Sequence, residues 1–239
     1  MLKRFLIGVL CVCFVVACCF FVADESYVIR GLLSNTNNDA AKTIIIDAGH
    51  GGFDGGAVAS DGTIEKDLNL SIALKLDAVL RSMGYKTVLV RNSDTATNDP
   101  ADGEKAKVSD IKNRLKLMDK YPNSVFVSVH MNKYSTTQPH GAQVFYSKSL
   151  GSEKLAESLQ NSVATHVQTD NKRVIKPTTK DIYLLSHATV PSVIVECGFL
   201  SNPNDLNNLK LQDYQLKLAV ALTYGIIDYI KSDVEIGES

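Results

Sequence analysis

Residues 43–52, which decide the fold, read Thr43-Ile44-Ile45-Ile46-Asp47-Ala48-Gly49-His50-Gly51-Gly52. A short apolar strand runs directly into a glycine-rich turn. Further runs rich in Val, Ile and Phe have strand composition, at 86–91, 124–130, 142–147 and 192–196. Between the strands, apolar residues recur at helical spacing, at 68–80, 155–163 and 216–227, and a more polar helix is expected at 108–120. The alternation predicts an α/β fold, an open and mostly parallel twisted sheet with helices on both faces.

The 239-residue chain begins with a membrane-type segment. Lys3 and Arg4 precede an uncharged apolar run from Phe5 to Ala23, close to the roughly 20 residues that cross a bilayer as a helix. The positive end is expected to stay cytoplasmic and the remainder to be exported. Residues 1–23 are therefore interpreted as a signal peptide or membrane anchor, and Val15-Val16-Ala17-Cys18 leaves lipoprotein processing open. We expect a linker at 24–41, a single domain at 42–232 and a C-terminal tail at 233–239.

Composition and charge narrow the class of protein. With 45% hydrophobic and 21% charged residues, the chain has the composition of a folded globular protein. Its 25 Lys and Arg residues stand against 26 Asp and Glu residues, which argues against nucleic acid as a partner. Only Cys197 lies outside the apolar N-terminal run, so no disulfide within the domain is expected.

Two histidines stand at the carboxyl ends of predicted strands. His50 lies between glycines that permit a tight turn, and His130 ends the run that begins at Ser124. Glu65, at the start of a helix predicted at 66–83, is a third possible ligand. Two His and one Glu form one of the recurrent three-ligand zinc sites. The three positions are far apart along the chain, so the residues alone leave open ordinary strand-end histidines and a helix N-terminal carboxylate.

A carboxylate and a thiol end the last predicted strand, Val193-Ile194-Val195-Glu196-Cys197. Burying Glu196 costs free energy unless it is paired or functional. At the carboxyl edge of the sheet it could take a proton from water and pass it to a leaving amine. Strand alternation points Cys197 to the opposite face, so we interpret it as a core residue. Of the remaining histidines, His166 is interpreted as a surface residue, and His140 and His187 as structural residues. His187 could also contact substrate.

These segments resemble the zinc-dependent N-acetylmuramoyl-L-alanine amidases of bacterial cell walls. The resemblance covers nearly all of 42–231. It rests on Ile46-Asp47-Ala48-Gly49-His50-Gly51-Gly52, Glu65-Lys66-Asp67-Leu68-Asn69-Leu70, Ser128-Val129-His130-Met131-Asn132, Gly141-Ala142-Gln143-Val144 and Val195-Glu196-Cys197-Gly198-Phe199-Leu200-Ser201-Asn202-Pro203. Arg91 and Arg114 also stand where the family usually has arginines. Met131 and Cys197 are small departures, because Ala and an apolar residue are commoner there.

The resemblance implies a six-stranded sheet flanked by helices and one Zn²⁺ ion per chain. The implied zinc ligands are His50, Glu65 and His130, and the implied catalytic residue is Glu196. The candidate substrate contacts are Asn132, His187 and Arg91. The implied reaction is hydrolysis of the amide between the lactyl group of N-acetylmuramic acid and the L-alanine of the stem peptide in peptidoglycan.

A lone catalytic domain behind a membrane segment is most similar to the sporulation-specific members. In those, the resemblance implies, removal of stem peptides starts formation of muramic-δ-lactam in spore cortex, which germination lytic enzymes later recognise. The protein is then expected to be exported and membrane-associated through residues 1–23, on the outer side of the cytoplasmic membrane or in the forespore intermembrane space.

Two other functions remain open on the same residues. One is a zinc peptidase that cleaves within peptides. The other is a non-catalytic, membrane-anchored wall-binding protein, although such a protein would not need both Glu65 and Glu196. Because the three ligands come from distant segments, metal binding requires a correctly docked sheet edge and helix. An accessory protein that orders the site is therefore a further expectation.

Overall fold

The computed structural model describes residues 42–99, 101 and 105–237. These residues belong to one compact unit. The predicted signal peptide or anchor at 1–23 and the predicted linker at 24–41 both lie outside the described part of the chain. Within that part, no helix combines the length and the apolar character needed to cross a membrane.

Six strands form one sheet in the order β2-β1-β3-β6-β4-β5. Their bounds are β1 Thr43–Ala48, β2 Thr87–Leu89, β3 Ser124–Asn132, β4 Gln143–Tyr146, β5 Lys176–Pro177 and β6 Ser192–Phe199. The pairings are parallel except between β4 and β6, which run antiparallel. The predicted mostly parallel, six-stranded sheet is therefore confirmed. The two residues of β5 have no strand pattern of their own, and only their pairing with β4 reveals them.

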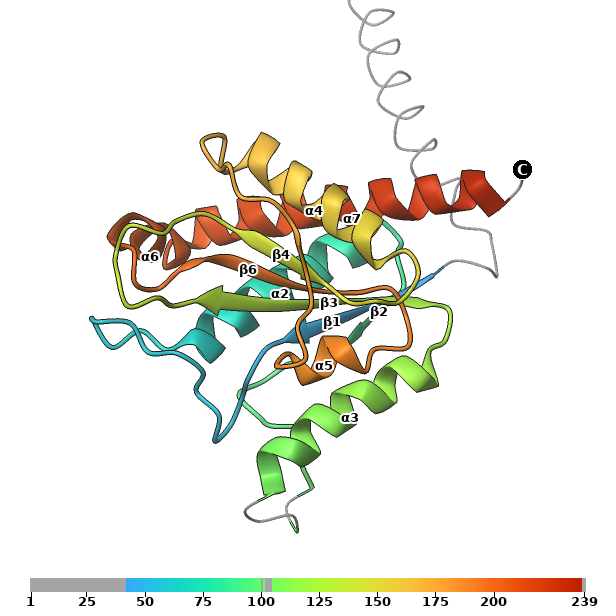
Figure 1. The fold of residues 1–239 in the computed structure, drawn as a ribbon, viewed down its shortest axis with the longest axis horizontal. Coiled ribbons are helices and arrows are strands. Elements are labelled where there is room, and N and C mark those ends of the chain that lie inside the picture. Colours follow the sequence, from blue (N-terminus) through green and yellow to red (C-terminus); the bar gives the residue numbers. More distant parts are fainter. Residues whose placement is uncertain (1–41, 100, 102–104, 238–239) are drawn as a thin grey trace, which may run out of the picture. The chain divides into compact units, whose positions relative to one another are not determined.

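Helices cover both faces of this sheet (Figure 1). On one face lie α2 (Glu65–Ser82), α4 (Ser152–His166) and α7 (Gln212–Gly237), and on the other α3 (Ala106–Lys120) and the short α5 (Tyr183–Ser186). Because both faces are covered, the central strands carry unbroken apolar runs rather than an alternating pattern. The short α6 (Pro203–Leu209) follows β6 and is capped by the side chain of Asn202, which accepts from two backbone N–H groups. The last helix continues beyond Ser232, where the predicted domain ends.

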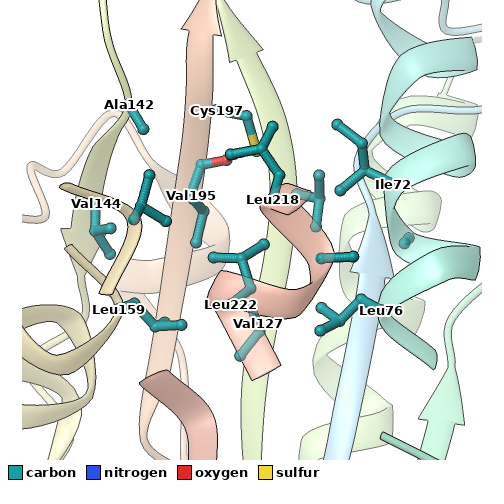
Figure 2. Close-up of a cluster of buried hydrophobic side chains, with 14 of the residues drawn as sticks. Ile72, Leu76, Val127, Ala142, Val144, Leu159, Val195, Cys197, Leu218 and Leu222 are labelled. Atoms are coloured by element: carbon teal, nitrogen blue, oxygen red, sulfur yellow. Dashed lines mark hydrogen bonds between the residues drawn. The ribbon is translucent and has the colours of Figure 1, made fainter. Parts of the chain in front are cut away.

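The main hydrophobic core lies between the sheet and α2, α4 and α7. Figure 2 shows Ile72, Leu159 and Leu222 from these helices gathered around Val127 of β3 and Val195 of β6. All five side chains are fully buried. Full burial of one such side chain stabilises the fold by about 1.5–3 kcal/mol. This core therefore stabilises the sheet within the described part of the chain, where Cys197 is a free cysteine.

The parallel arrangement positions the site. In the pairing register, Ala48 at the end of β1 lies opposite Val129 of β3, and His130 lies opposite Glu196 of β6. A register shift between His130 and Asn132 interrupts regular pairing just beyond this point. Because parallel strands end at the same edge, the turn after β1 and the ends of β3 and β6 come together there.

Candidate metal centre

His50, Glu65 and His130 converge at this edge. One ligand atom from each lies within 4.8 Å of the other two. His50 Nε2 is 3.2 Å and His130 Nδ1 is 3.0 Å from the same oxygen, Glu65 Oε1. The two imidazole rings stand edge to face, with centroids 4.9 Å apart. A turn, a helix start and a strand end thus deliver three donors to one point.

The turn that carries His50 is held by two buried arginines. His50 has a φ of 63°, a left-handed conformation that is unfavourable for a residue with a side chain. Arg91 donates from Nε to the carbonyl of Ala48 and from Nη2 to that of Gly49, at 2.8 and 3.1 Å. Arg114 donates from Nη2 to the carbonyl of His50, at 2.8 Å. The hydrogen bonds from the two arginines therefore maintain a backbone conformation that is energetically unfavourable for a histidine.

Arg114 also belongs to a buried ion-pair network. It pairs with Asp47 through Nη1, and its Nε donates to Asp110 at 2.9 Å. Ser128 donates to the other oxygen of Asp47 at 2.6 Å. Since all of these side chains are nearly inaccessible to solvent, each charge depends on its partner. This network ties α3 to the end of β1 directly beneath the His50 turn.

Two glycines make room for the imidazole rings. A Cβ placed on Gly49 would lie 2.1 Å from Nε2 and 2.2 Å from Cε1 of His130. A Cβ on Gly56 would lie 2.6 Å from both Glu65 Oε2 and His50 Cδ2. Only residues without a side chain permit this close approach. The glycines around the site thus serve packing as well as turn geometry.

Glu65 is held as a carboxylate. Its Oε2 accepts from the backbone N–H of Ala57 at 2.8 Å, and its Oε1 from that of Met131 at 3.1 Å. Burial acts to raise the pKa of Glu65, but hydrogen bonds from His130 and His50 outweigh it and hold the pKa well below its usual range. Burial acts to lower the pKa of His50, yet the contacts with Glu65 and Asp54 raise it overall. The site therefore attracts a positive charge.

Glu196 faces the same space from β6. Its side chain is only partly exposed, and its Oε2 atom is buried with no hydrogen-bond partner among the residues that the structure describes. Burial raises the pKa of Glu196 to about 7. The neighbouring Cys197 is 1% exposed and lies in the main core (Figure 2), so its interpretation as a core residue is confirmed. Burial raises the pKa of the Cys197 thiol and keeps it unreactive.

A groove of about 270 Å³ opens beside these side chains. Its polar end is lined by His50, His130 and Glu196 together with charged neighbours that include Asp54 and Lys107. Its other wall is apolar and comes from α3, from α5 with the residue before it, and from β6: Ile111, Ile182, Tyr183, Leu184 and Ile194. A larger hollow of about 430 Å³ between α4 and α7 contains none of the predicted site residues. The groove at the sheet edge is the candidate substrate site.

The donor set fits a zinc ion. Ligand atoms at about 2.0 Å from a tetrahedral zinc lie about 3.3 Å from one another. The two measured separations from Glu65 Oε1, 3.2 and 3.0 Å, are close to this value. Two imidazoles and one carboxylate would hold such an ion with three ligands. Glu196 lines the same groove as both histidines, and its buried Oε2, which has no partner among the described residues, has the chemistry of a group that handles a proton.

The chain matches the family model described as N-acetylmuramoyl-L-alanine amidase over residues 44–228. The chain belongs to this family. A germination-specific N-acetylmuramoyl-L-alanine amidase of Bacillus subtilis is 32% identical over 193 residues, which is 80% of each chain. As a member of this amidase family, the chain is a cell-wall hydrolase.

Solved structures agree with this assignment. The CwlD amidase of Clostridioides difficile, solved in complex with the GerS lipoprotein, is 38% identical with a TM-score of 0.76, and the match covers 80% of this chain and 99% of that chain. An N-acetylmuramoyl-L-alanine amidase from Clostridium difficile 630 is 30% identical with a TM-score of 0.72, over 81% of this chain and 99% of that one. The predicted fold and family are thus both confirmed.

The three predicted substrate contacts, Arg91, His187 and Asn132, differ from one another in burial and in their neighbours. Arg91 is buried beneath the turn of this amidase, and its guanidinium donates to backbone carbonyls. His187 stacks on Tyr183, with ring centroids 3.9 Å apart, and Tyr183 rather than His187 lines the groove. Asn132 is half-buried at the end of β3. Substrate contact by these three residues stays a prediction.

Sequence reasoning missed two residues of the site. Asp54 Oδ2 lies 3.0 Å from His50 Nδ1. The sequence could have indicated this contact, because Asp54 follows His50 by four residues and the glycines between them form a turn. Tyr183 carried no signal, because it belongs to a four-residue helix that the apolar pattern does not reveal. His140 and His166 lie away from the centre, on a loop and on α4.

Proposed function

We propose that this amidase is zinc-dependent and that it removes stem peptides from spore-cortex peptidoglycan, the first step towards muramic-δ-lactam. The convergence of His50, Glu65 and His130 beside the buried carboxylate of Glu196 carries the catalytic part of this proposal. The similarity to the germination-specific amidase of Bacillus subtilis supports the cortex as substrate. The bond cut joins the lactyl carbonyl of N-acetylmuramic acid to the nitrogen of L-alanine.

His50, Glu65 and His130 would hold the ion. Zn²⁺ in this site supplies Lewis-acid polarisation of water and of the scissile carbonyl. In the metal-free site, hydrogen bonds from His130 and His50 outweigh burial and hold the pKa of Glu65 well below its usual range, so the side chain is a carboxylate ready to bind a cation. The apolar wall of the groove, with Tyr183 and Ile182, offers a surface against which the apolar parts of the substrate can pack.

Glu196 moves the proton. Its Oε2 has no competing hydrogen bond among the described residues, so it is free to accept the proton of the attacking water. Burial raises its pKa to about 7, so at neutral pH the same oxygen can then donate that proton to the nitrogen of the departing L-alanine. General acid–base catalysis of this kind contributes typically about 10²–10⁴-fold to the rate.

The test is muropeptide analysis by mass spectrometry of cortex-type peptidoglycan, with zinc content measured on the same protein samples. Wild type should release stem peptides with a free L-alanine amino terminus. Glu196→Gln should keep one zinc per chain and lose about 10²-fold or more of the activity. Normal turnover by Glu196→Gln would remove Glu196 from the mechanism.

A pair of histidine variants tests the ligand set. His130→Ala should lose zinc, whereas the surface variant His166→Ala should keep both zinc and activity. One tightly held zinc in His130→Ala would contradict the assignment. Cleavage inside the stem peptide would indicate the zinc peptidase instead, and unchanged muropeptides with zinc-loaded protein would indicate a non-catalytic wall-binding protein.

The cortex role and the partner have their own tests. Spores without this protein should lack muramic-δ-lactam, and Glu196→Gln should fail to restore it. We propose that the chain is exported and acts at the outer side of the membrane. We also propose that it works with an accessory protein, and the solved complex of CwlD with the GerS lipoprotein supports this second proposal. Full zinc content and activity in the purified chain alone would argue against the need for such a partner.

A further inference from the structure

Asp54 is a carboxylate beside the centre that the proposed ligand set does not use. Its Oδ2 lies 3.0 Å from His50 Nδ1, on the ring edge opposite to Glu65. Its Oδ1 accepts from the backbone N–H of Gly56 at 3.2 Å, and its backbone forms a two-bond bridge with Gly51. Lys107 on α3 places Nζ 3.2 Å from the same Oδ2. The carboxylate is thus held in one orientation by the turn and by α3.

The His50 ring is held between two carboxylates. Its Nδ1 meets Asp54, and its Nε2 meets Glu65 Oε1 at 3.2 Å. His130 has the reverse arrangement, because its Nδ1 meets Glu65 Oε1 at 3.0 Å. The Nε2 edge of His130 lies against Gly49, where even a Cβ would be only 2.1 Å away. The two histidines therefore present different nitrogens towards the centre.

We propose that Asp54 is a positioning residue that fixes His50 as the neutral tautomer with hydrogen on Nδ1, so that His50 binds the metal through Nε2 and His130 binds it through Nδ1. The inference rests on the zinc site of the proposed function. A metal-binding imidazole needs one nitrogen lone pair directed at the ion, and the partner of the other nitrogen decides which one it is. A carboxylate partner also makes the ligating nitrogen a stronger donor.

Loss of such a partner typically weakens metal binding by about 10–100-fold. Asp54→Ala should therefore weaken zinc binding by about this factor, since His50 loses both its orientation and its Nδ1–H acceptor. Asp54→Asn should fall between Asp54→Ala and wild type, because an amide oxygen accepts the same hydrogen bond without the charge. This partial rescue separates orientation of the ring from electrostatic attraction of the metal.

Asp94→Ala is the matched control. Asp94 also supports the glycine turn, because it accepts from the backbone N–H of Gly52 at 2.8 Å and from Lys66 Nζ at 2.7 Å. No described contact joins it to His50. Removing Asp94 should therefore perturb the same turn but leave zinc affinity within about threefold of wild type, well below the effect of losing a direct partner of a ligand.

The experiment is zinc competition against a chromophoric chelator, with the full chain and each of these variants. Failure of wild type to bind zinc would overturn the proposed function itself. Tight zinc binding by wild type together with unchanged affinity in Asp54→Ala would overturn only the role of Asp54. An equal loss of zinc affinity in Asp54→Ala and Asp94→Ala would overturn the inference, because it would show that Asp54 only stabilises the turn.

Long-range ¹H–¹⁵N correlation spectra of the zinc-loaded protein test the ligand atoms directly. His50 should show a protonated Nδ1 and a metal-bound Nε2, and His130 should show a metal-bound Nδ1. The three histidines away from the centre give reference signals. A metal-bound Nδ1 in His50 would contradict the inference, whatever the affinities show.

Discussion

The substitution Gly49→Ala should remove the metal while leaving the fold in place. The added Cβ would lie 2.1 Å from Nε2, 2.2 Å from Cε1 and 2.6 Å from Cδ2 of His130. Gly49 does not have a left-handed φ, so its backbone accepts alanine and the imidazole ring is the obstacle. The ring must swing away from Glu65, and one of the three donors is lost.

The magnitude follows from these contacts. Forcing a methyl group into a filled space costs about 1–3 kcal/mol of stability. Zinc affinity should fall by more than about 100-fold, because loss of a ligand exceeds the 10–100-fold effect of losing a ligand's partner. In the double variant Gly49→Ala/His130→Ala the space is empty again, so the stability of the zinc-free protein should recover although the metal site does not.

Urea unfolding of the zinc-free protein and chelator competition measure the two effects separately. Gly55→Ala is the control in the same loop, because its Cβ would make an ordinary 3.4 Å contact with Ile64 Cγ2. Gly55→Ala should bind zinc like wild type. Wild-type zinc affinity in Gly49→Ala, or failure of the double variant to regain stability, would refute this reasoning.

Three further outcomes are expected. Burial raises the pKa of Glu196 from 4.5 to about 7, so the native state binds this proton more tightly than the unfolded state and zinc-free stability falls as pH rises between these values. Glu196→Gln should therefore be up to about 3 kcal/mol more stable than wild type at about pH 8 and equal near pH 4, which pH-dependent urea unfolding would show. Arg114→Leu leaves the fully buried Asp47 without its cation and should cost about 3–5 kcal/mol, partly recovered by adding Asp47→Asn; a loss below about 1 kcal/mol would contradict the network. Although burial acts to lower it, the pKa of His50 is raised above 6.5 by the contacts with Glu65 and Asp54, so protons compete with zinc for this ligand. Zinc affinity in chelator competition should therefore fall as the pH drops through this region, and a level affinity would contradict this.

Local periodicity predicted the layers of the fold because it records which side of each element is buried. The apolar runs at β1, β3 and β6 and the helical spacing in α2, α4 and α7 were visible along the chain, and the structure places them in one sheet with helices on both faces. The period of two in a strand was enough to assign Cys197 to the core and Glu196 to the opposite side.

Contacts between distant segments were decided only by the tertiary structure. Spacing alone left the metal site open, since the distance between His50, Glu65 and His130 depends on strand register and on how α2 docks. The chain by itself therefore determined the identity and the order of the reactive groups and the strand ends on which two of them lie. Which nitrogen each histidine turns to the centre, and what holds the turn beneath it, arise from packing at the sheet edge, because those contacts join residues that no local pattern connects.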